Sequence, residues 1–370
     1  MPKRPVLITA GGTGGHVYPG LAVARALEKQ DIPVVWMGTR KGLEARVIPA
    51  AGIEMAWLEV TGLRGKGALT LISAPFRLLK ALYQSVRIMR QHQPVAILGM
   101  GGFVAGPGGL VAALMGIPVV IHEQNAIPGL TNRLLSKFSK KVLEGFPGSF
   151  TNAKHKTVPT GNPVRQDISA LPLAAQRMAD CQSRRLRLLI IGGSLGAQAL
   201  NETVPRALAE LPGEIRPEVR HQAGRNKDEA TKLAYEAAEV TAAVSAFIED
   251  MAEAYGWADL VICRSGALTI AELASAGMAS ILVPYPYAVD DHQTANGLYL
   301  SEQGAAILLP QTELSAATLA ANLHTLMSEP AQLISMGEKA RQLAKPNATV
   351  EVAAIVAGLA NYTFNTEVIA

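Results

Sequence analysis

Residues 6–27 read VLITAGGTGGHVYPGLAVARAL, and this stretch decides the fold. Val6 to Ile8 form a short uncharged run that is typical of a buried parallel strand. Leu21, Ala24 and Leu27 recur with helical spacing. Between them, the glycines at 11–15 tolerate positive φ and let another molecule approach the backbone. A glycine turn that enters a helix presents free N–H groups and the positive dipole end, which suit an anion, although the glycines could also serve only a tight turn.

Two well-known phosphate loops do not match this stretch. The NTPase loop ends in Gly-Lys-Ser/Thr, whereas this one ends in Gly-Gly-His. The dinucleotide fingerprint needs a third glycine at position 17, where this chain has Val17. It also needs an acidic residue directly after the second strand, but the apolar run 33–37 is followed by Gly38-Thr39. A nicotinamide-dependent dehydrogenase is therefore disfavoured, while anion binding remains open.

The opening pattern returns halfway along the chain. The apolar run 188–191 is followed by GGSLG at 192–196 and a helical stretch from about 197 to 208. A third glycine cluster, 99–109, follows the strand expected at 95–98. We predict an α/β protein with two Rossmann-like halves and parallel sheets that face a deep, shared cleft.

Composition supports a globular protein with two domains. The 370 residues are 49% apolar and 17% charged, which permits a large core. Two cysteines make no disulfide framework and suggest a reducing compartment, and the basic N-terminus does not continue into a signal peptide. The segment 91–122 lacks Asp, Glu, Lys and Arg, but its glycines and prolines favour strands, loops and a short helix over a membrane span.

Charge is distributed unevenly between the halves. Residues 1–163 carry 19 Lys or Arg against 7 Asp or Glu, whereas residues 164–370 carry 15 against 23, so a net charge of +4 conceals an excess of +12 in the first half. This half is expected to meet an anionic partner. No nucleic-acid module is recognisable, which leaves an anionic membrane surface as the favoured partner.

One segment of the first half could supply the membrane contact. Ser73 and Pro75 suggest a helix start, and an apolar stripe of helical spacing follows it. Basic residues surround the stripe, as in helices that lie on lipid headgroups, although the stripe could equally pack on the sheet. The stripe comprises Ile72, Phe76, Leu79, Tyr83 and Val86, and the basic residues are Arg64, Lys66, Arg77, Lys80, Arg87 and Arg90.

Seven motifs, in order along the chain, resemble the MurG family of peptidoglycan N-acetylglucosaminyltransferases. They are GGTGGHVYPGLAVA (11–24), GLRGKG (62–67), GMGGFVAGPGGL (99–110), HEQNAIPGLTN (122–132), GNPVR (161–165), GGSLGAQALN (192–201) and CRSGALTIAELASAG (263–277). The resemblance covers nearly the whole chain.

The resemblance implies a GT-B fold. It implies an acceptor and membrane domain at 1–163, to which a C-terminal helix of about 342–364 returns, and a UDP-GlcNAc-binding domain at 164–341. The implied reaction is inverting transfer of GlcNAc from UDP-GlcNAc to the C4 hydroxyl of MurNAc in undecaprenyl-pyrophosphoryl-MurNAc-pentapeptide (lipid I), which gives lipid II. The expected place is the cytoplasmic face of the bacterial inner membrane, as a peripheral protein. Other cell-wall synthesis proteins are expected partners, and cell shape and division depend on the product.

The resemblance also implies donor-binding residues. Glu272 is expected to accept hydrogen bonds from the ribose hydroxyls, the backbone of Ile248 to pair with uracil, and Arg165 to face phosphate. Each residue also has a purely structural alternative. Glu272 could interact favourably with the helix dipole, the Ile248 side chain could belong to the hydrophobic core, and Arg165 could form a salt bridge at the hinge. Further donor contacts are expected from Thr13, Gly14, Gly15, Asn125, Ser194, Ala267, Leu268, Thr269, Ile270, Ala271 and Gln293, the last with His292 beside it.

Inverting transfer requires a base for the acceptor hydroxyl and stabilisation of the departing UDP. His16 is the candidate base, because the positive end of a helix dipole disfavours the protonated imidazole; a simple turn cap is its alternative. Glu123 and His122 are rival bases. No Asp-x-Asp metal motif occurs, so we expect that no metal or other cofactor is required and that backbone amides and hydroxyls, including Ser194, hold the diphosphate.

Two rival functions were weighed against transfer. A UDP-N-acetylglucosamine epimerase would share the fold and nucleotide but would not need the basic helix or the HEQN loop. A two-lobed binding protein would close on its ligand without chemistry, and the missing signal peptide counts against it.

Overall fold

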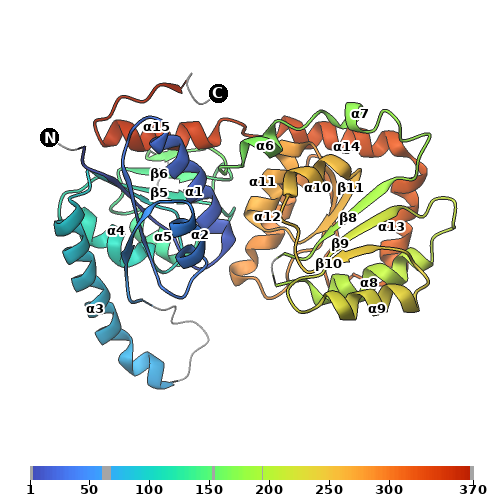
Figure 1. Ribbon diagram of the computed structural model, residues 1–370, viewed down its shortest axis with the longest axis horizontal. Helices are drawn as coiled ribbons and strands as arrows, with labels where there is room; N and C mark the ends of the chain where they lie inside the picture. Colours follow the sequence, from blue (N-terminus) through green and yellow to red (C-terminus); the bar gives the residue numbers. More distant parts are fainter. Residues whose placement is uncertain (1–2, 61–67, 152–154, 194, 367–370) are drawn as a thin grey trace. The chain divides into compact units, whose positions relative to one another are not determined.

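The computed structural model describes residues 3–60, 68–151, 155–193 and 195–366. The chain divides into two compact units, each with its own sheet and core (Figure 1). The first combines Met1–Val164 with Lys345–Ala370, and the second is the continuous stretch Arg165–Ala344. The first unit is therefore built from two separate pieces of chain.

In the first unit, the described residues form a seven-stranded parallel sheet in the order β3-β2-β1-β4-β5-β6-β7. Its central strands are mostly apolar and are buried along their whole length, as expected where helices cover both faces. The strands are β1 (Val6–Thr9), β2 (Val34–Gly38), β3 (Glu54–Trp57), β4 (Ala96–Gly99), β5 (Val119–Glu123), β6 (Lys141–Glu144) and β7 (Thr157–Val158).

Helices cover both faces of this sheet. α1, α2 and α15 pack on one face and α3, α4 and α5 on the other. Their bounds are α1 (Gly14–Glu28), α2 (Glu44–Ala50), α3 (Ala68–His92), α4 (Ala105–Leu114), α5 (Leu130–Leu135) and α15 (Ala348–Leu359).

Two helix boundaries differ from expectation. The returning helix, expected at about 342–364, begins at Ala348, because Pro346 disfavours helical backbone in the residue before it. It ends at Leu359, and Asn361 has a left-handed φ of 58°. The expectation that Ser73 starts a helix is wrong, because α3 already begins at Ala68.

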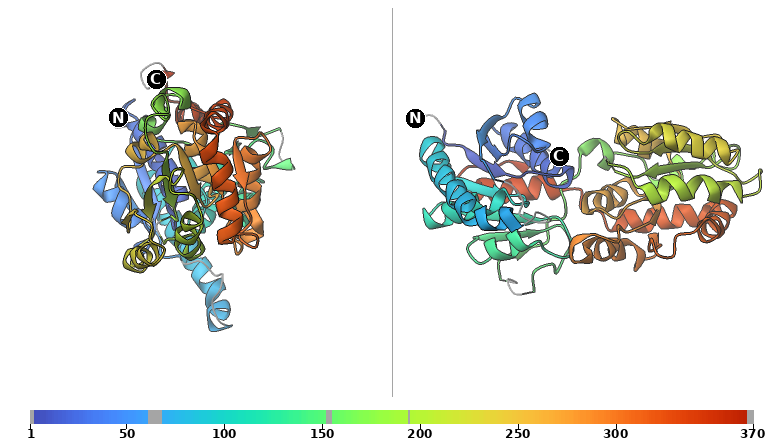
Figure 2. Two further views of the ribbon diagram at one scale, coloured as in Figure 1. Left: turned by 90° about the vertical axis from the view of Figure 1, so that its right-hand side faces the viewer. Right: turned by 90° about the horizontal axis from the view of Figure 1, so that it is seen from below.

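The α3 helix leaves the body of the first unit. Its C-terminal half packs on the sheet through Ala81, Ser85, Ile88 and Met89, all of which are buried. Its N-terminal half extends outward, as Figure 1 and the left view of Figure 2 show. Phe76, Leu78 and Leu79 in this half are each more than half exposed.

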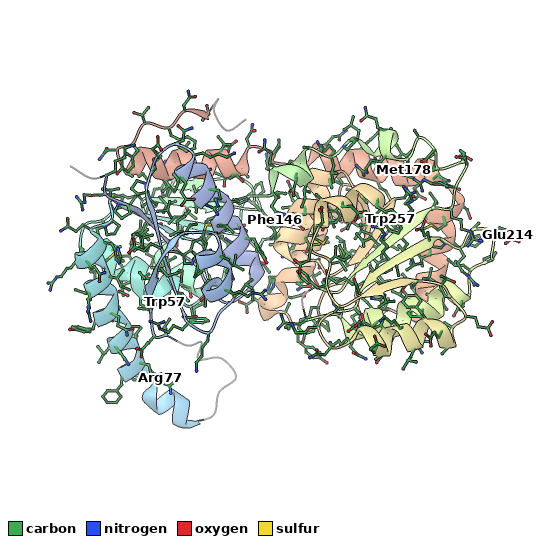
Figure 3. The ribbon with its side chains drawn as sticks, in the orientation of Figure 1. Trp57, Arg77, Phe146, Met178, Glu214 and Trp257 are labelled. Carbon is green, nitrogen blue, oxygen red and sulfur yellow. The ribbon has the colours of Figure 1, made fainter. Side chains whose placement is uncertain are left out.

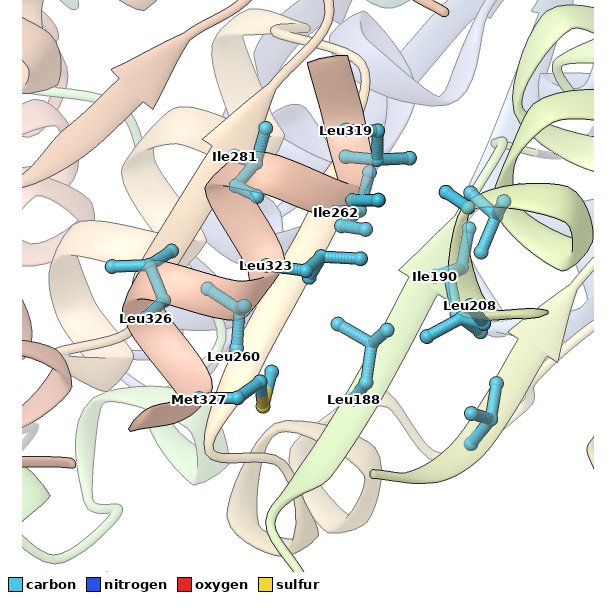
Figure 4. Close-up of a cluster of buried hydrophobic side chains, with 14 of the residues drawn as sticks. Leu188, Ile190, Leu208, Leu260, Ile262, Ile281, Leu319, Leu323, Leu326 and Met327 are labelled. Atoms are coloured by element: carbon cyan, nitrogen blue, oxygen red, sulfur yellow. The ribbon is translucent and has the colours of Figure 1, made fainter. Parts of the chain in front are cut away.

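In the second unit, the described residues form a six-stranded parallel sheet in the order β10-β9-β8-β11-β12-β13. One face carries a large apolar core, in which α13 lies across β8, β11 and β12 (Figure 4). The strands are β8 (Arg187–Ile191), β9 (Glu218–Gln222), β10 (Ala243–Ser245), β11 (Leu260–Cys263), β12 (Ala279–Leu282) and β13 (Ala306–Leu308). The helices are α6 (Gln166–Ser169), α7 (Ala174–Arg177), α8 (Gln198–Ala209), α9 (Asp228–Ala237), α10 (Met251–Trp257), α11 (Ala267–Ala276), α12 (His292–Ser301) after the 3-10 helix η2 (Val289–Asp291), α13 (Ala316–Ser328) and α14 (Pro330–Gln342).

Each sheet has one point where the strand order reverses. In the first unit it lies between β1 and β4, and in the second between β8 and β11. Open parallel sheets bind ligands beyond the carboxyl ends of their strands at such points. All three glycine loops predicted from the sequence follow these strands, so the fold directs attention to them.

Candidate functional site

The first glycine loop, residues 10–13, rests on a buried carboxylate from α2. One oxygen of Glu44 accepts from the N–H of Gly12 at 3.1 Å, and the other accepts from the N–H and the hydroxyl of Thr39 at 2.9 and 2.7 Å. Glu44 thus supplies an anion from within the protein, and the Gly12 amide is already engaged.

Only some glycines of the first unit are required by packing. A side-chain carbon on Gly11 would lie 2.6 Å from Glu44, and one on Gly102 would lie 2.8 Å from the Gly11 carbonyl. Gly12 has a φ of 95° with open space beyond it. Gly15 lies inside α1, where glycine is unfavourable, yet the nearest atom is 3.8 Å away, an ordinary contact. Neither packing nor backbone strain therefore requires glycine at position 15, which stays a candidate for close approach of a ligand.

His16 is the third residue of α1 and is partly exposed. Its Nδ1 lies 3.2 Å from the hydroxyl of Thr13, the residue that precedes the helix. Across the turn, a side-chain carbon on Gly101 would lie 3.1 Å from Nε2 of His16. The loop after β4 therefore leaves room for this imidazole only because residue 101 is glycine.

Glu123, the rival base, is the last residue of β5 and is 2% exposed. One of its oxygens accepts from the backbone and side-chain amides of Asn125 at 3.0 and 3.1 Å. The other accepts from the N–H of Gly129 at 3.1 Å and from Asn132 Nδ2 at 2.9 Å. These four bonds hold the HEQN loop in place.

His122, the other rival, is completely buried. Its Nε2 donates to the Gly161 carbonyl at 2.9 Å, and its Nδ1 accepts from Gln124 Nε2 at 3.1 Å. Burial lowers the pKa of His122 to about 4, so the ring is neutral at neutral pH. Both ring nitrogens are occupied, which leaves His122 no lone pair for a substrate proton.

In the second unit, the glycine loop after β8 is shaped mainly by its neighbour after β9. A side-chain carbon on Gly196 would lie on the Ala223 carbonyl, and one on Gly224 would meet the Gly196 backbone. Gly193, with a φ of 79°, faces open space. Ser194, the expected phosphate ligand, lies outside the described residues.

The helix α11 begins at the carboxyl end of β11, with Gly266 as its N-cap. The first N–H groups of a helix have no intrahelical acceptor, which leaves those of Ala267, Leu268 and Thr269 for a ligand. The N–H of Ile270 donates to the Gly266 carbonyl, and its side chain is buried. Of the expected donor contacts on α11, Ile270 therefore supports the helix instead of facing a ligand.

Glu272 lies on the second turn of α11, partly buried. The hydroxyl of Tyr255 donates to it at 3.1 Å. Burial raises the pKa of Glu272 to about 7, although the charge of nearby Arg165 acts in the opposite direction. Arg165, exposed before α6, also lies 3.8 Å from Asp167. Glu272 and Arg165 thus combine a carboxyl group whose pKa lies near neutral pH with an exposed guanidinium.

The loop after β10 stays hydrogen-bonded to the end of β9, through the side chain of Gln222. The N–H of Ile248 donates to Gln222 Oε1 at 3.0 Å, just beyond backbone bonds from Ala223 and Gly224. Ile248 is partly buried and stands at the carboxyl edge of the sheet. Gln222 therefore sets the position of the Ile248 backbone.

The loop after β12 is braced by Arg264 and Gln293. Arg264 donates to the carbonyls of Val283 and Pro284 at 3.1 and 3.0 Å and to Gln311 at 2.6 Å. Gln293, at the start of α12, accepts from the N–H of Tyr285 at 2.9 Å. In the described structure Gln293 thus shapes this loop, and it stays a candidate for the donor sugar.

The expected membrane stripe is exposed at three of its positions. Phe76 is 75% exposed, Leu79 63% and Tyr83 71%, whereas Val86 packs on the core. Arg77 lies on the same outlying part of α3, as Figure 3 shows, and Lys80 pairs with Glu59 at 2.5 Å. The side chain of Ile72 lies outside the described residues.

A second apolar surface, not anticipated from the sequence, lies on α5 and the turn after it. Leu130, Leu134 and Phe138 recur every four residues and are 65%, 52% and 53% exposed. Arg133 and Lys137 are interspersed with them and are also exposed. Because α3 and α5 both pack against α4, the two surfaces belong to one side of the sheet.

Among the helices of the described ranges, none is long and apolar enough to cross a bilayer. Within those ranges, no group of three or more His, Cys, Asp or Glu side chains is placed to hold a metal ion.

Sequence reasoning missed the polar residues that support these loops, notably Glu44, Gln124 and Gln222. Gln124 stood within the quoted HEQN motif, and Gln222 ends the strand 218–222, two residues before Gly224, so position relative to a strand end was the available signal. Glu44 carries no local signal, because its partners lie on other elements.

Comparison with known proteins identifies the family. Residues 6–144 match the glycosyltransferase family 28 N-terminal domain, and residues 187–352 match the family's C-terminal domain. A UDP-N-acetylglucosamine--N-acetylmuramyl-(pentapeptide) pyrophosphoryl-undecaprenol N-acetylglucosamine transferase from Alkalilimnicola ehrlichii is 55% identical over 95% of this chain and 98% of its own. The enzyme of the same name from Pseudomonas fluorescens is 53% identical over 93% and 95%.

Solved structures agree with this assignment. The crystal structure of Acinetobacter baumannii MurG has a TM-score of 0.82 and 43% identity, covering 96% of this chain and 99% of that one. A UDP-GlcNAc 2-epimerase from Neisseria meningitidis has a TM-score of 0.66 at 14% identity, covering 94% and 98%, a likeness of fold alone. The two parallel sheets form the GT-B fold, and the chain belongs to the MurG family within glycosyltransferase family 28.

Proposed function

We propose that this chain transfers GlcNAc from UDP-GlcNAc with His16 as general base, no metal ion, and an anionic membrane as its platform. The activity is that of an N-acetylglucosamine transferase of peptidoglycan synthesis, whose acceptor is N-acetylmuramyl-(pentapeptide) pyrophosphoryl-undecaprenol. The observation that carries the activity is identity above 50% to enzymes of that name over more than nine-tenths of the chain.

The proposed reaction is an inverting displacement. The C4 hydroxyl oxygen of the acceptor sugar forms a bond to the anomeric carbon, the bond to the UDP oxygen breaks, and the base takes the hydroxyl proton. Such a step needs one group to receive the proton and another to stabilise the charge on the departing diphosphate.

The second unit supplies the donor half of this chemistry. The first N–H groups of α11 and the open glycine at 193 offer donors to phosphate without a cation. Glu272, when ionised, accepts from the ribose hydroxyls, and Arg165 brings positive charge beside it. Ile248, Asn125 and Gln293 stay candidates for uracil and sugar contacts, as do Thr13 and Gly14 beside the base.

His16 is favoured as base over its rivals by exposure and hydrogen bonding. It is partly exposed at a helix N-terminus, where the dipole favours the neutral ring. Its Nδ1 lies within hydrogen-bond distance of the Thr13 hydroxyl, which helps to orient the ring. Glu123 and His122 are buried, and every polar atom of each is occupied.

A transfer assay tests these roles. Radiolabelled UDP-GlcNAc and a short-chain lipid I analogue are incubated with protein in EDTA, and β-1,4 disaccharide is counted. His16→Ala should lower kcat by about 100-fold or more with UDP affinity retained. Glu272→Ala should weaken UDP binding, and Glu338→Gln, an exposed change on α14, should behave as the parent. Full turnover by His16→Ala would refute the base assignment, and loss of turnover in EDTA would refute the metal-free site.

The membrane proposal rests on exposed apolar side chains beside basic ones on α3. Burying an exposed Phe or Leu side chain in lipid contributes about 1.5–3 kcal/mol. Phe76→Ser with Leu79→Ser should therefore release the protein from vesicles containing anionic phosphatidylglycerol in a flotation assay. Leu233→Ser, an equally exposed change on α9 of the second unit, is the matched control. Equal flotation of the parent and the double variant would contradict the proposal.

A further inference from the structure

Gln124 follows β5 directly, and its side-chain amide is buried at the point where the strand order of the first sheet reverses. Its Nε2 donates to the Met100 carbonyl at 2.9 Å and to His122 Nδ1 at 3.1 Å. The amide thus joins the loop after β4 to the end of β5.

Hydrogen bonding determines which way this amide points. The Gly161 carbonyl can only accept, so His122 Nε2 carries the proton and His122 Nδ1 carries the lone pair. Both His122 Nδ1 and the Met100 carbonyl then require a donor, and the NH2 group of Gln124 must face them. The carbonyl oxygen, Oε1, is consequently directed the other way.

That oxygen is buried and accepts no hydrogen bond from the described residues. A buried acceptor without a hydrogen bond calls for a physical explanation. A side-chain carbon on Gly101 would lie 3.4 Å from Gln124 Oε1 and 3.1 Å from His16 Nε2. The unpartnered oxygen and the imidazole therefore border the same point, and residue 101 is glycine, with a φ of 94°.

We propose that Gln124 Oε1 is a positioning group for the reaction, which stabilises His16 once its imidazole has taken the proton of the acceptor hydroxyl. In this step the hydroxyl O–H bond breaks and an N–H bond forms at His16 Nε2. The hydroxyl oxygen bonds to the anomeric carbon, and the electron pair of the anomeric C–O bond leaves with UDP. A carbonyl oxygen carries partial negative charge, and beside a newly charged ring it favours the charged form. The inference rests on the proposed role of His16.

The acidic limb of the pH–rate profile tests this inference, because transfer stops when the base is already protonated. Gln124→Met removes the oxygen and should move the limb to lower pH by a few tenths of a unit. Gln124→Glu places a charge there and should move it to higher pH by about one unit. Asn162→Ala is the matched control: it removes a bond to the Gln124 backbone carbonyl and leaves Oε1 untouched, so the limb should stay in place.

The outcomes separate this inference from the function on which it rests. If His16→Ala retains the limb, the base assignment is wrong. If His16→Ala abolishes the limb but neither Gln124 variant moves it, the base assignment stands and the role of Gln124 is overturned. Thermal unfolding of each variant identifies loss of folding, and Gln124→Glu remains informative if Gln124→Met does not fold, because a purely structural role would change its rate without shifting its pH midpoint.

Discussion

Replacing Glu272 by Gln should stabilise the second unit and lower its affinity for UDP. Burial raises the pKa of Glu272 from its ordinary 4.5 to about 7. Each pKa unit corresponds to about 1.36 kcal/mol, so an ionised Glu272 costs the folded state about 3 kcal/mol at high pH. Glutamine keeps an oxygen for the Tyr255 hydroxyl and has no charge to desolvate.

The effect depends on pH with a definite sign. The folded state holds the Glu272 proton more tightly than the unfolded chain, so the free energy of unfolding falls as pH rises from about 4.5 to about 7. Glu272→Gln should therefore match the parent near pH 4.5 and exceed it by about 2–3 kcal/mol at pH 8.5. The gain appears only where the carboxylate would be ionised.

Urea unfolding followed by the emission of Trp257 measures this in the second unit, in a background with Trp36→Phe and Trp57→Phe in the first (Figure 3). Glu338→Gln, exposed on α14, controls for the loss of one surface charge and should change stability little. UDP titration of the same proteins should show weaker binding by Glu272→Gln alone. Equal stability of Glu272→Gln and the parent at pH 8.5 would refute the reasoning, because Glu272 would then be as well solvated as a surface glutamate.

Three further changes have defined outcomes. Gly15→Ala should raise thermal stability by about 0.5–1 kcal/mol yet lower the transfer rate; an unchanged rate would mean that no substrate approaches that backbone. Gly102→Ala should destabilise the first unit by about 1–3 kcal/mol, because its φ is 77° and the new carbon would lie 2.8 Å from the Gly11 carbonyl; unchanged melting would show that the two loops separate easily. Burial lowers the pKa of His221 to about 3, so His221 is neutral in the folded protein and the free energy of unfolding falls as pH drops below about 6.5. Between pH 7 and 4.5, His221→Gln should lose about 2–3 kcal/mol less of this free energy than the parent. An equal loss of both proteins in urea unfolding would show that His221 is not the group responsible.

Local patterns were sufficient to predict much of the fold. The uncharged run at 6–8 and the repeated glycine turns identified strands that are buried on both faces, and these lie at the centre of each sheet. The sequence pattern did not predict the start of α3 at Ala68, because no strong capping signal precedes Ser73 in this helix. It also could not give the break at Pro346 within a segment of otherwise helical composition.

The candidate site was less accessible to sequence reasoning, because its supports join distant elements. Glu44 holds the loop at Gly12 from thirty-two residues away, and Gln222 holds Ile248 from the neighbouring strand. Glu123 was named from the sequence as a rival base to His16. Its four hydrogen bonds, which no spacing reveals, indicate a loop support instead.

The return of α15 to the first unit has a consequence for synthesis on the ribosome. Val352, Ala353, Val356 and Ala357 of this helix are buried in the first core, so that core is incomplete until nearly the whole chain has left the exit tunnel. The second unit, by contrast, is one uninterrupted stretch that ends at Ala344. Nascent domains usually mature in the order in which they are made. Here the second unit, although it is synthesised later, should fold first. The core of the first unit should stay incomplete until α15 has been synthesised.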